Sequence, residues 1–142
     1  MSLQRLTENH KAMIQQMWDE TPQEMKDNYF NKSGIYGIYC DGELVYIGKS
    51  INLLQRWLMH KSHVYCPESP EYNRPIYKEI RRALKAGHKI SAGVIEFCDC
   101  PDIELQLEQE ESKLIKKYVP KLNRRIPTAG RGYVTKGLGR LC

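Results

Sequence analysis

A glutamate interrupts the apolar stripe of the last predicted helix, which runs from about residue 102 to residue 118. At about 100° per residue, Glu111 falls inside this stripe, whose members are Ile103, Leu107, Leu114, Ile115 and Tyr118. A carboxylate that faces a core is costly unless a cation or a metal ion compensates it. Glu111 therefore either meets a basic residue or lines a concave site for a divalent cation. The remaining alternative is a glutamate at the edge of the stripe that reaches solvent.

An arginine and a histidine share one face of an earlier predicted helix. Arg56 and His60 lie four residues apart, within a helix expected from about residue 51 to residue 61. A guanidinium can stabilise charge on a phosphate, and an imidazole can move a proton near neutral pH. Exposed helix residues would show the same spacing. The pattern alone indicates only a basic domain with side chains suited to phosphate.

The stretch GIYGIYCDGELVYIGKS, residues 34–50, places several tyrosines in a predicted β-hairpin that turns near Asp41-Gly42. A two-residue turn would put Tyr36 and Tyr46 on opposite faces of the sheet. A three-residue loop, with Gly42 at positive φ, would instead place Tyr36 directly across from Tyr46 and pair Tyr39 with Glu43. We predict the second register. Tyr39 then falls on the other face as a packing residue, with Ile35, Val45 and Ile47.

The elements that must position these side chains follow from hydrophobic periodicity and from turn signals. Helices are expected at residues 3–19, near Thr21, and at 51–61, 75–85 and 102–118, with the hairpin at 34–48 and a strand in KISAGVIEFC. We therefore predict an α/β (α+β) fold with a small three-stranded, mainly antiparallel sheet flanked by helices. The predicted organisation is an N-terminal helical extension (1–33), a central domain (34–125) and a basic, Gly-containing tail (126–142).

Positive charge is concentrated late in the chain. The protein has 142 residues, which suits one domain, and a net charge of +5; from Ser112 to the end, nine residues are basic and none is acidic. Such a distribution favours a nucleic-acid partner, and a solvated tail that aids solubility is the alternative. The expected nucleic-acid contacts are Lys78, Arg81, Arg82 and Lys85 on one helix and Arg124, Arg125 and Arg131 in the tail.

Targeting signals are not expected in this sequence. No apolar run approaches the roughly 20 residues of a membrane span, and the polar start MSLQRLTENH predicts no signal peptide. We therefore expect a cytoplasmic protein with no membrane partner.

The order and spacing of these residues resemble the GIY-YIG nuclease superfamily over residues 34 to about 125. Gly34-Ile35-Tyr36 stands nine residues before Tyr46-Ile47-Gly48, whereas Gly37-Ile38-Tyr39 leaves only six, too few for that family. The resemblance then matches the helix arginine, the histidine one turn later, the metal-binding glutamate and the closing asparagine to Arg56, His60, Glu111 and Asn123.

The resemblance implies a metal-dependent endonuclease that hydrolyses phosphodiester bonds in DNA, with one divalent ion, Mg²⁺ or Mn²⁺, held mainly by Glu111. It implies that Arg56 adds positive charge at the phosphate. Tyr36 would position or deprotonate the attacking water with help from Lys49 or His60.

The same resemblance implies that Tyr46 bonds the phosphate or its neighbours and that Asn123 holds the site together, unless Asn123 is simply a polar residue that ends a helical segment. RNA as substrate, and a monomer or a homodimer as the active form, stay open. The rival prediction is a non-catalytic nucleic-acid-binding module or an accessory subunit with the same fold.

Overall fold

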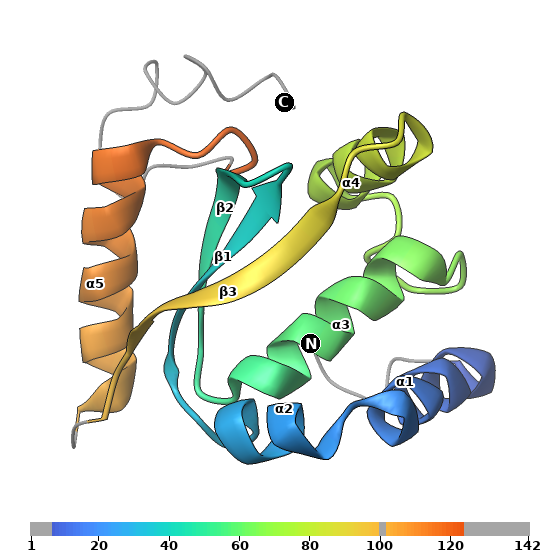
Figure 1. Ribbon diagram of the computed structural model, residues 1–142, viewed down its shortest axis with the longest axis horizontal. Helices are drawn as coiled ribbons and strands as arrows, with labels where there is room; N and C mark the ends of the chain where they lie inside the picture. The colour runs from blue at the N-terminus through green and yellow to red at the C-terminus, as the bar shows by residue number, and fades with distance from the viewer. Residues whose placement is uncertain (1–6, 100–101, 124–142) are drawn as a thin grey trace.

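The computed structural model describes residues 7–99 and 102–123, which form five helices and three strands (Figure 1). The elements follow in the order α1 (Glu8–Glu20), α2 (Gln23–Tyr29), β1 (Gly34–Cys40), β2 (Glu43–Ser50), α3 (Leu53–Tyr65), α4 (Pro75–Lys85), β3 (Ile90–Phe97) and α5 (Ile103–Tyr118). The strands pair in the order β2-β1-β3, and both pairings are antiparallel. The predicted α+β class is confirmed. Arg124, Arg125, Arg131 and the expected tail lie outside the described residues.

The helices cover the two faces of the sheet unequally (Figure 1). Helix α5 packs on β1 and β2 from one side, whereas α3 and α4 contact β2 and β3 from the other side, with α1 and α2 against α3. Two apolar clusters fill the layers. One cluster contains Ile38, Val45 and Ile80, and the other, beneath α5, contains Ile35, Ile47 and Leu107. Each fully buried side chain of this size contributes about 1.5–3 kcal/mol to stability.

The hairpin turn differs from the predicted three-residue loop. Cys40 pairs with Glu43, so the loop is the two residues Asp41 and Gly42, whose φ angles of 50° and 85° are both positive. Two positive φ angles characterise the type I′ turn, which matches the twist of the strands and favours Asp-Gly. The predicted pairing of Tyr39 with Glu43 is therefore wrong, because Tyr39 pairs with Leu44.

A β-bulge in β2 nevertheless brings the two tyrosines to one face. The register shifts between Ile38 and Tyr39, so that Val45 is extra, Ile38 pairs with Tyr46 and Tyr36 pairs with Gly48. Tyr36 and Tyr46 are thus diagonal neighbours on the same face, with ring centroids 6.3 Å apart. The prediction of a shared face is confirmed, although a bulge rather than a longer loop produces it.

Because of the bulge, Val45 lies on the opposite face of the sheet from the one predicted. Instead of joining Ile47 beneath α5, Val45 packs in the cluster that contains Tyr36. Tyr39 does lie on the face opposite Tyr36, as predicted. Its strand partner Leu44 packs with the α5 cluster, and a methyl group added to Gly37 would touch both Leu44 and the Tyr39 ring.

The helix after the hairpin begins later than expected and runs further. Asn52 is its N-cap, with the side-chain oxygen accepting from the Gln55 amide, while the Ser50 hydroxyl donates to the Asn52 carbonyl. Helix α3 therefore spans Leu53–Tyr65 rather than about 51–61. Among the described residues, none of the helices is both long and apolar enough to span a membrane.

Candidate functional site

Three buried side chains from three elements form a hydrogen-bonded chain on the α3 side of the sheet. The Tyr36 hydroxyl on β1 lies 2.5 Å from His60 Nε2 on α3, and His60 Nδ1 lies 2.9 Å from the Tyr77 hydroxyl on α4. All three residues are at most 7% exposed. A neutral imidazole has one N–H and one lone pair, so one tyrosine donates to His60 and the other accepts from it.

A glycine opposite Tyr36 leaves room for its ring. A Cβ atom on Gly48 would lie closer than 3.0 Å to the Tyr36 hydroxyl and to two of its ring carbons. Tyr36 therefore lies directly over the backbone of the residue with which it pairs. The glycine of the Tyr46-Ile47-Gly48 triplet thus has a steric role, since any side chain there would displace Tyr36 from His60.

Burial keeps both members of the Tyr36–His60 pair neutral. Desolvation, with smaller contributions from Arg56, His63 and Arg74, lowers the pKa of His60 to about 3. Desolvation and the nearby Tyr46 raise the pKa of Tyr36 well above 10, against the lowering effect of Arg56. The resting site therefore disfavours both tyrosinate and imidazolium, so a proton moves from Tyr36 to His60 only if Tyr36 gains another proton in the same step.

Glu111 on α5 is half-buried, and its charge reaches the tyrosines. Burial raises the pKa of Glu111, while the charges of Lys49 and Arg56 lower it and Glu108 raises it. Desolvation raises the pKa of Tyr46, and the charge of Glu111 raises it further. Within residues 7–99 and 102–123, no hydrogen bond or ion pair occupies the Glu111 carboxylate. Lys49 and Arg56 are close enough to lower its pKa, but neither pairs with it directly.

The site spans the outer edge of the sheet, where β2 lies. Lys49 pairs with Ile35 and so projects toward the α5 side, where it is close enough to act on Glu111. Tyr46 projects toward the α3 side and is still sensitive to Glu111. The two halves of the site therefore influence each other across β2.

Asn123 ties the chain after α5 to this edge strand. Its side-chain oxygen accepts from the Ile47 amide and its side-chain nitrogen donates to the Ile47 carbonyl, both at 2.8 Å, and the residue is buried. The Leu122 amide donates to the Val45 carbonyl beside it. Asn123 thus pairs with β2 as a strand would and fixes the end of α5, and these bonds fit the expected supporting position.

Two exposed arginines line a polar hollow of about 290 Å³ next to this network. Arg56 and Arg74 share the hollow with Gln55, Met59 and Tyr77, among others. Sequence reasoning missed Arg74, which is the N-cap residue of α4. A cation at the positive end of a helix is electrostatically unfavourable, and that position was a readable signal for an anionic partner. The only ion pair of Arg74 among the described residues is with Glu71, at 3.3 Å.

Tyr77 was also missed, because its spacing placed it on the apolar stripe of α4. Its ring is indeed buried, but its hydroxyl reaches His60. Buried tyrosine hydroxyls nearly always find a partner. A tyrosine in a predicted core position therefore signals a polar neighbour, although the sequence does not identify that neighbour.

The four basic residues of α4 differ in how accessible they are. Lys78, Arg82 and Lys85 are exposed, and Arg82 pairs with Glu79 at 2.6 Å. Arg81 is instead half-buried and donates to the carbonyls of His63, Val64 and Tyr72. Arg81 therefore joins the loop to the end of α3, and its predicted contact with nucleic acid stays a prediction.

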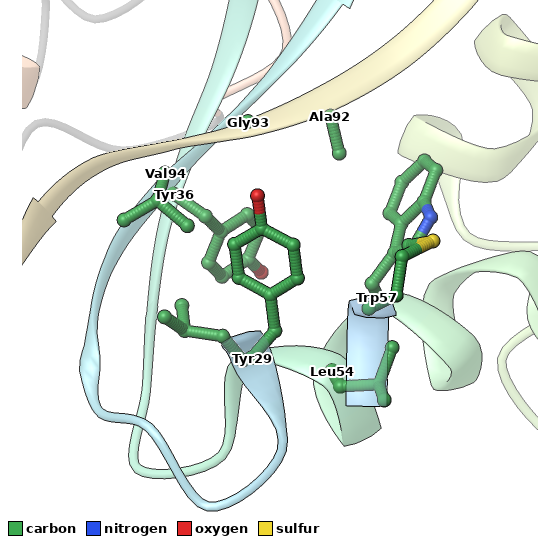
Figure 2. Close-up of a pocket in the computed structure, with 9 residues that line it drawn as sticks. Tyr29, Tyr36, Leu54, Trp57, Ala92, Gly93 and Val94 are labelled. Atoms are coloured by element: carbon green, nitrogen blue, oxygen red, sulfur yellow. The ribbon is translucent and has the colours of Figure 1, made fainter. Parts of the chain in front are cut away.

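An apolar pocket of about 240 Å³ lies behind Tyr36 (Figure 2). Tyr29 of α2 and Trp57 of α3 flank it, Val94 of β3 lines it, and Tyr36 forms part of its wall. Helix α2, through Met25 and Tyr29, thus covers this side of Tyr36. This cover contributes to the desolvation that raises the pKa of Tyr36.

A separate group of metal-type ligands lies at the hairpin turn. Atoms of Cys40, Asp41 and His88 that could bind a metal ion all lie within 4.8 Å of one another. The Asp41 carboxylate already accepts from the Lys89 amide at 2.8 Å and lies 2.6 Å from His88 Nδ1. These bonds account for the cluster as a link between the turn and the start of β3.

Comparison with known proteins identifies no relative, because no family model, curated protein or solved structure matches the chain. The functional reading therefore depends on the residues and their geometry.

Proposed function

We propose that the protein is a metal-dependent DNA endonuclease of the GIY-YIG type. The observation that supports this most directly is the 2.5 Å contact between the Tyr36 hydroxyl and His60 Nε2, with Arg56 and Glu111 close enough to shift the pKa of Tyr36. A buried base–hydroxyl pair next to a cation and an unpaired carboxylate has the parts needed for hydrolysis of a phosphodiester. The sequence order of the same residues supports the family assignment.

The proposed metal ligand fits one hard divalent cation. Glu111 is half-buried, has a raised pKa and has no hydrogen-bond or ion-pair partner among the described residues, so binding a cation would compensate its desolvation. A single carboxylate suits Mg²⁺, which keeps several of its waters. When bound, such an ion supplies positive charge to the phosphoryl group and to the leaving 3′ oxygen.

The side chains then divide the proton transfer and the charge stabilisation. A water attacks phosphorus and loses a proton to the Tyr36 oxygen, while the Tyr36 hydroxyl proton passes to His60 Nε2. The bond from phosphorus to the 3′ oxygen breaks, and the departing 3′ oxygen takes a proton from solvent water, which leaves a 3′-hydroxyl and a 5′-phosphate. His60 then returns its extra proton to solvent. Tyr77 holds the far nitrogen of His60, so the imidazole keeps the orientation needed to accept this proton.

The proposed roles of the other predicted residues follow from their positions. His60 rather than Lys49 assists Tyr36, because His60 makes the hydrogen bond and Lys49 lies on the Glu111 side. Arg56 and Arg74 hold phosphate oxygens in their shared hollow, and Tyr46 bonds the phosphate on the same face. Asn123 acts as a positioning residue through β2.

A second candidate is a nucleic-acid-binding module without catalysis. The observation in its favour is that Tyr36 is 7% and His60 is 5% exposed, so a water can reach Tyr36 only through a small opening. In this case the arginines and the cations of α4 would only bind phosphates.

Plasmid cleavage in Mg²⁺ by the wild type, Glu111→Gln and a control, Glu104→Gln, separates the two candidates. Glu104 is an exposed carboxylate on the first turn of the same helix. We expect loss of cleavage only in Glu111→Gln, with unchanged circular dichroism. Equal cleavage by all three proteins would contradict the role of Glu111, and DNA binding without cleavage by the wild type would favour the module. A monomer with one site should nick, whereas a double-strand cut needs two sites.

A further inference from the structure

A second basic hollow lies on the far part of α3 and α4. It has a volume of about 600 Å³, and Tyr65 at the end of α3, Tyr72 in the following loop, and Lys78 and Lys85 of α4 line it. None of these residues belongs to the Tyr36–His60–Tyr77 network. We call this hollow the α3–α4 groove.

The floor of the α3–α4 groove is held in place before any ligand binds. The Arg81 guanidinium donates to the carbonyls of His63, Val64 and Tyr72 at 3.3, 3.1 and 2.6 Å. The same guanidinium lies 3.6 Å from the centre of the Tyr72 ring. The loop is thereby fixed to the end of α3, so little ordering cost is left for a ligand.

The exposed side chains of the groove combine positive charge with an aromatic face. Lys78, Arg82 and Lys85 are exposed, and the nearby carboxylate of Glu79 offsets only one of these charges. Tyr65 is 55% exposed although it is a large aromatic residue. Cations that follow a strand of phosphates, together with an aromatic ring on which a base stacks, are the two components of single-strand recognition.

The position of the groove connects it to the proposed site. The arginine hollow uses Arg56 and Met59 of α3 and Tyr77 of α4, and the groove uses later residues of the same two helices. A nucleic-acid strand leaving Arg74 along α4 would therefore pass Lys78 after about 6 Å and Lys85 after about 16 Å, at 1.5 Å per residue. That distance accommodates a few nucleotides.

We propose that the α3–α4 groove binds an unpaired DNA strand that continues from the scissile phosphate, with one base stacked on Tyr65. This inference rests on the proposed function, because it takes DNA as the partner, and it narrows the substrate to duplexes that carry a single-stranded extension or branch. In an intact duplex the base faces are already stacked on their neighbours, and Tyr65 would have no face to contact.

Binding is measured with Glu111→Gln protein, so that no cleavage disturbs the equilibrium. Fluorescence anisotropy compares a blunt duplex with the same duplex carrying a short 5′ or 3′ single-stranded overhang. We expect tighter binding of one overhang polarity, and a loss of about 10-fold on that DNA in Tyr65→Ala, from the usual stacking energy of one base. Blunt-duplex affinity should not change. Tyr118→Ala, which removes a ring that is 50% exposed on α5, is the matched control and should bind both DNAs as the parent does.

The cations of the groove give an independent readout. Lys78→Gln combined with Lys85→Gln should reduce the salt slope for overhang DNA by about 1.4, since each single-strand phosphate contact contributes about 0.7. Equal affinity for blunt and overhang DNA, or equal losses on both DNAs in Tyr65→Ala, would overturn the proposal. A Tyr65-dependent preference in a protein whose wild type never cleaves DNA would uphold the groove and reject the nuclease. Cleavage by the wild type without a Tyr65-dependent preference would uphold the nuclease and reject the groove.

Discussion

The two faces of the sheet bury similar apolar side chains but treat polar groups differently. Beneath α5, the buried cluster is built from Ile35, Ile47, Leu107 and Ile115 with the Cys98 thiol. On the α3 side, isoleucines and leucines again form the core, but buried histidines and tyrosines are set among them. Of the six buried polar residues in the described part of the chain, five lie in α1, in α3 or in the loop after α3: His10, His60, Ser62, His63 and Ser69.

This difference shows that the buried polar groups on the α3 side are not needed to pack a helix against the sheet. The α5 face demonstrates that aliphatic side chains are enough to hold a helix on this sheet. The Tyr36–His60–Tyr77 chain adds groups whose desolvation is unfavourable, as the lowered pKa of His60 to about 3 shows. Local departures from the simplest packing are expected mainly at functional sites. The comparison therefore points to the α3 side as the face that carries the buried hydrogen-bonded groups of the proposed site, while Glu111 approaches from α5.

The largest expected effect follows from Tyr36→Phe. The change removes the hydroxyl that contacts His60 Nε2 and keeps the ring that fills the space over Gly48. Cleavage should fall by about 10²- to 10⁴-fold, the usual contribution of a general acid–base group, while the protein stays folded. Single-turnover cleavage and thermal unfolding measure the two effects separately.

Ile35→Ala is the matched variant on the α5 face, one residue away on the same strand. It should cost about 2–5 kcal/mol of the free energy of unfolding, because a fully buried side chain is truncated. The fraction that stays folded at low temperature should cleave at close to the wild-type rate. If both variants lost only stability, or both lost only activity, the proposed division between the faces would be wrong.

Acid should destabilise the protein through the α3 face. Burial lowers the folded-state pKa of His60 to about 3 and of His63 to about 4, below the ordinary value of 6.5. The unfolded chain therefore binds more protons between pH 6.5 and 4, so this contribution to stability is complete above pH 6.5 and is lost as the pH falls. Each histidine contributes a slope of about 1.4 kcal/mol per pH unit in that window.

Urea unfolding at pH 7 and pH 5 measures this loss, and His63→Gln shows its origin. The variant keeps a side chain that can bond Ser69 but does not titrate. The difference in unfolding free energy between pH 7 and pH 5 should shrink by about 2 kcal/mol in the variant. An unchanged difference would mean that His63 does not contribute to acid stability and that other groups control it.

Sequence reasoning reached the fold and the shared face because both depend on short-range patterns. The hairpin, the later helices and the strand of residues 90–97 are encoded by alternation, turn residues and helical spacing. Asp41-Gly42 also favours a two-residue type I′ turn. The predicted register replaced that turn with a three-residue loop, because only the longer loop placed Tyr36 and Tyr46 on one face without a bulge. The bulge at Val45 satisfies both requirements, and no residue type marks it in advance.

The parts of the site that escaped prediction depend on contacts between distant segments. Tyr77 meets His60 across two helices, and Arg74 approaches Arg56 only because α4 packs beside α3. His10 is fully buried on α1 and stands at helical spacing from Met13 and Ile14, but the sequence does not show what its ring packs against. Spacing along one helix predicts which residues share its face, but it does not say which other helix that face will meet.

A smaller loss of cleavage than in Tyr36→Phe is expected from Gly48→Ala, which tests whether Tyr36 must stay where the structure places it. The added methyl group would overlap the Tyr36 ring and hydroxyl, so the ring must move away from His60. Gly93→Ala in β3 is the control, because its methyl group would only touch the Tyr39 ring at 3.7 Å. Both glycines lie in strands, so both variants gain a similar strand propensity.

Cleavage should fall by about 10²-fold in Gly48→Ala, the usual cost of displacing a reacting group by about 1 Å, and should not change in Gly93→Ala. Combining Gly48→Ala with Tyr36→Phe distinguishes displacement from general damage. If Gly48 acts through the tyrosine hydroxyl, the double variant should be little worse than Tyr36→Phe alone, because the group that the methyl displaces is already absent. Fully additive losses would mean that Gly48 supports the site by another route, and the close packing of Tyr36 on β2 would then be structural rather than catalytic.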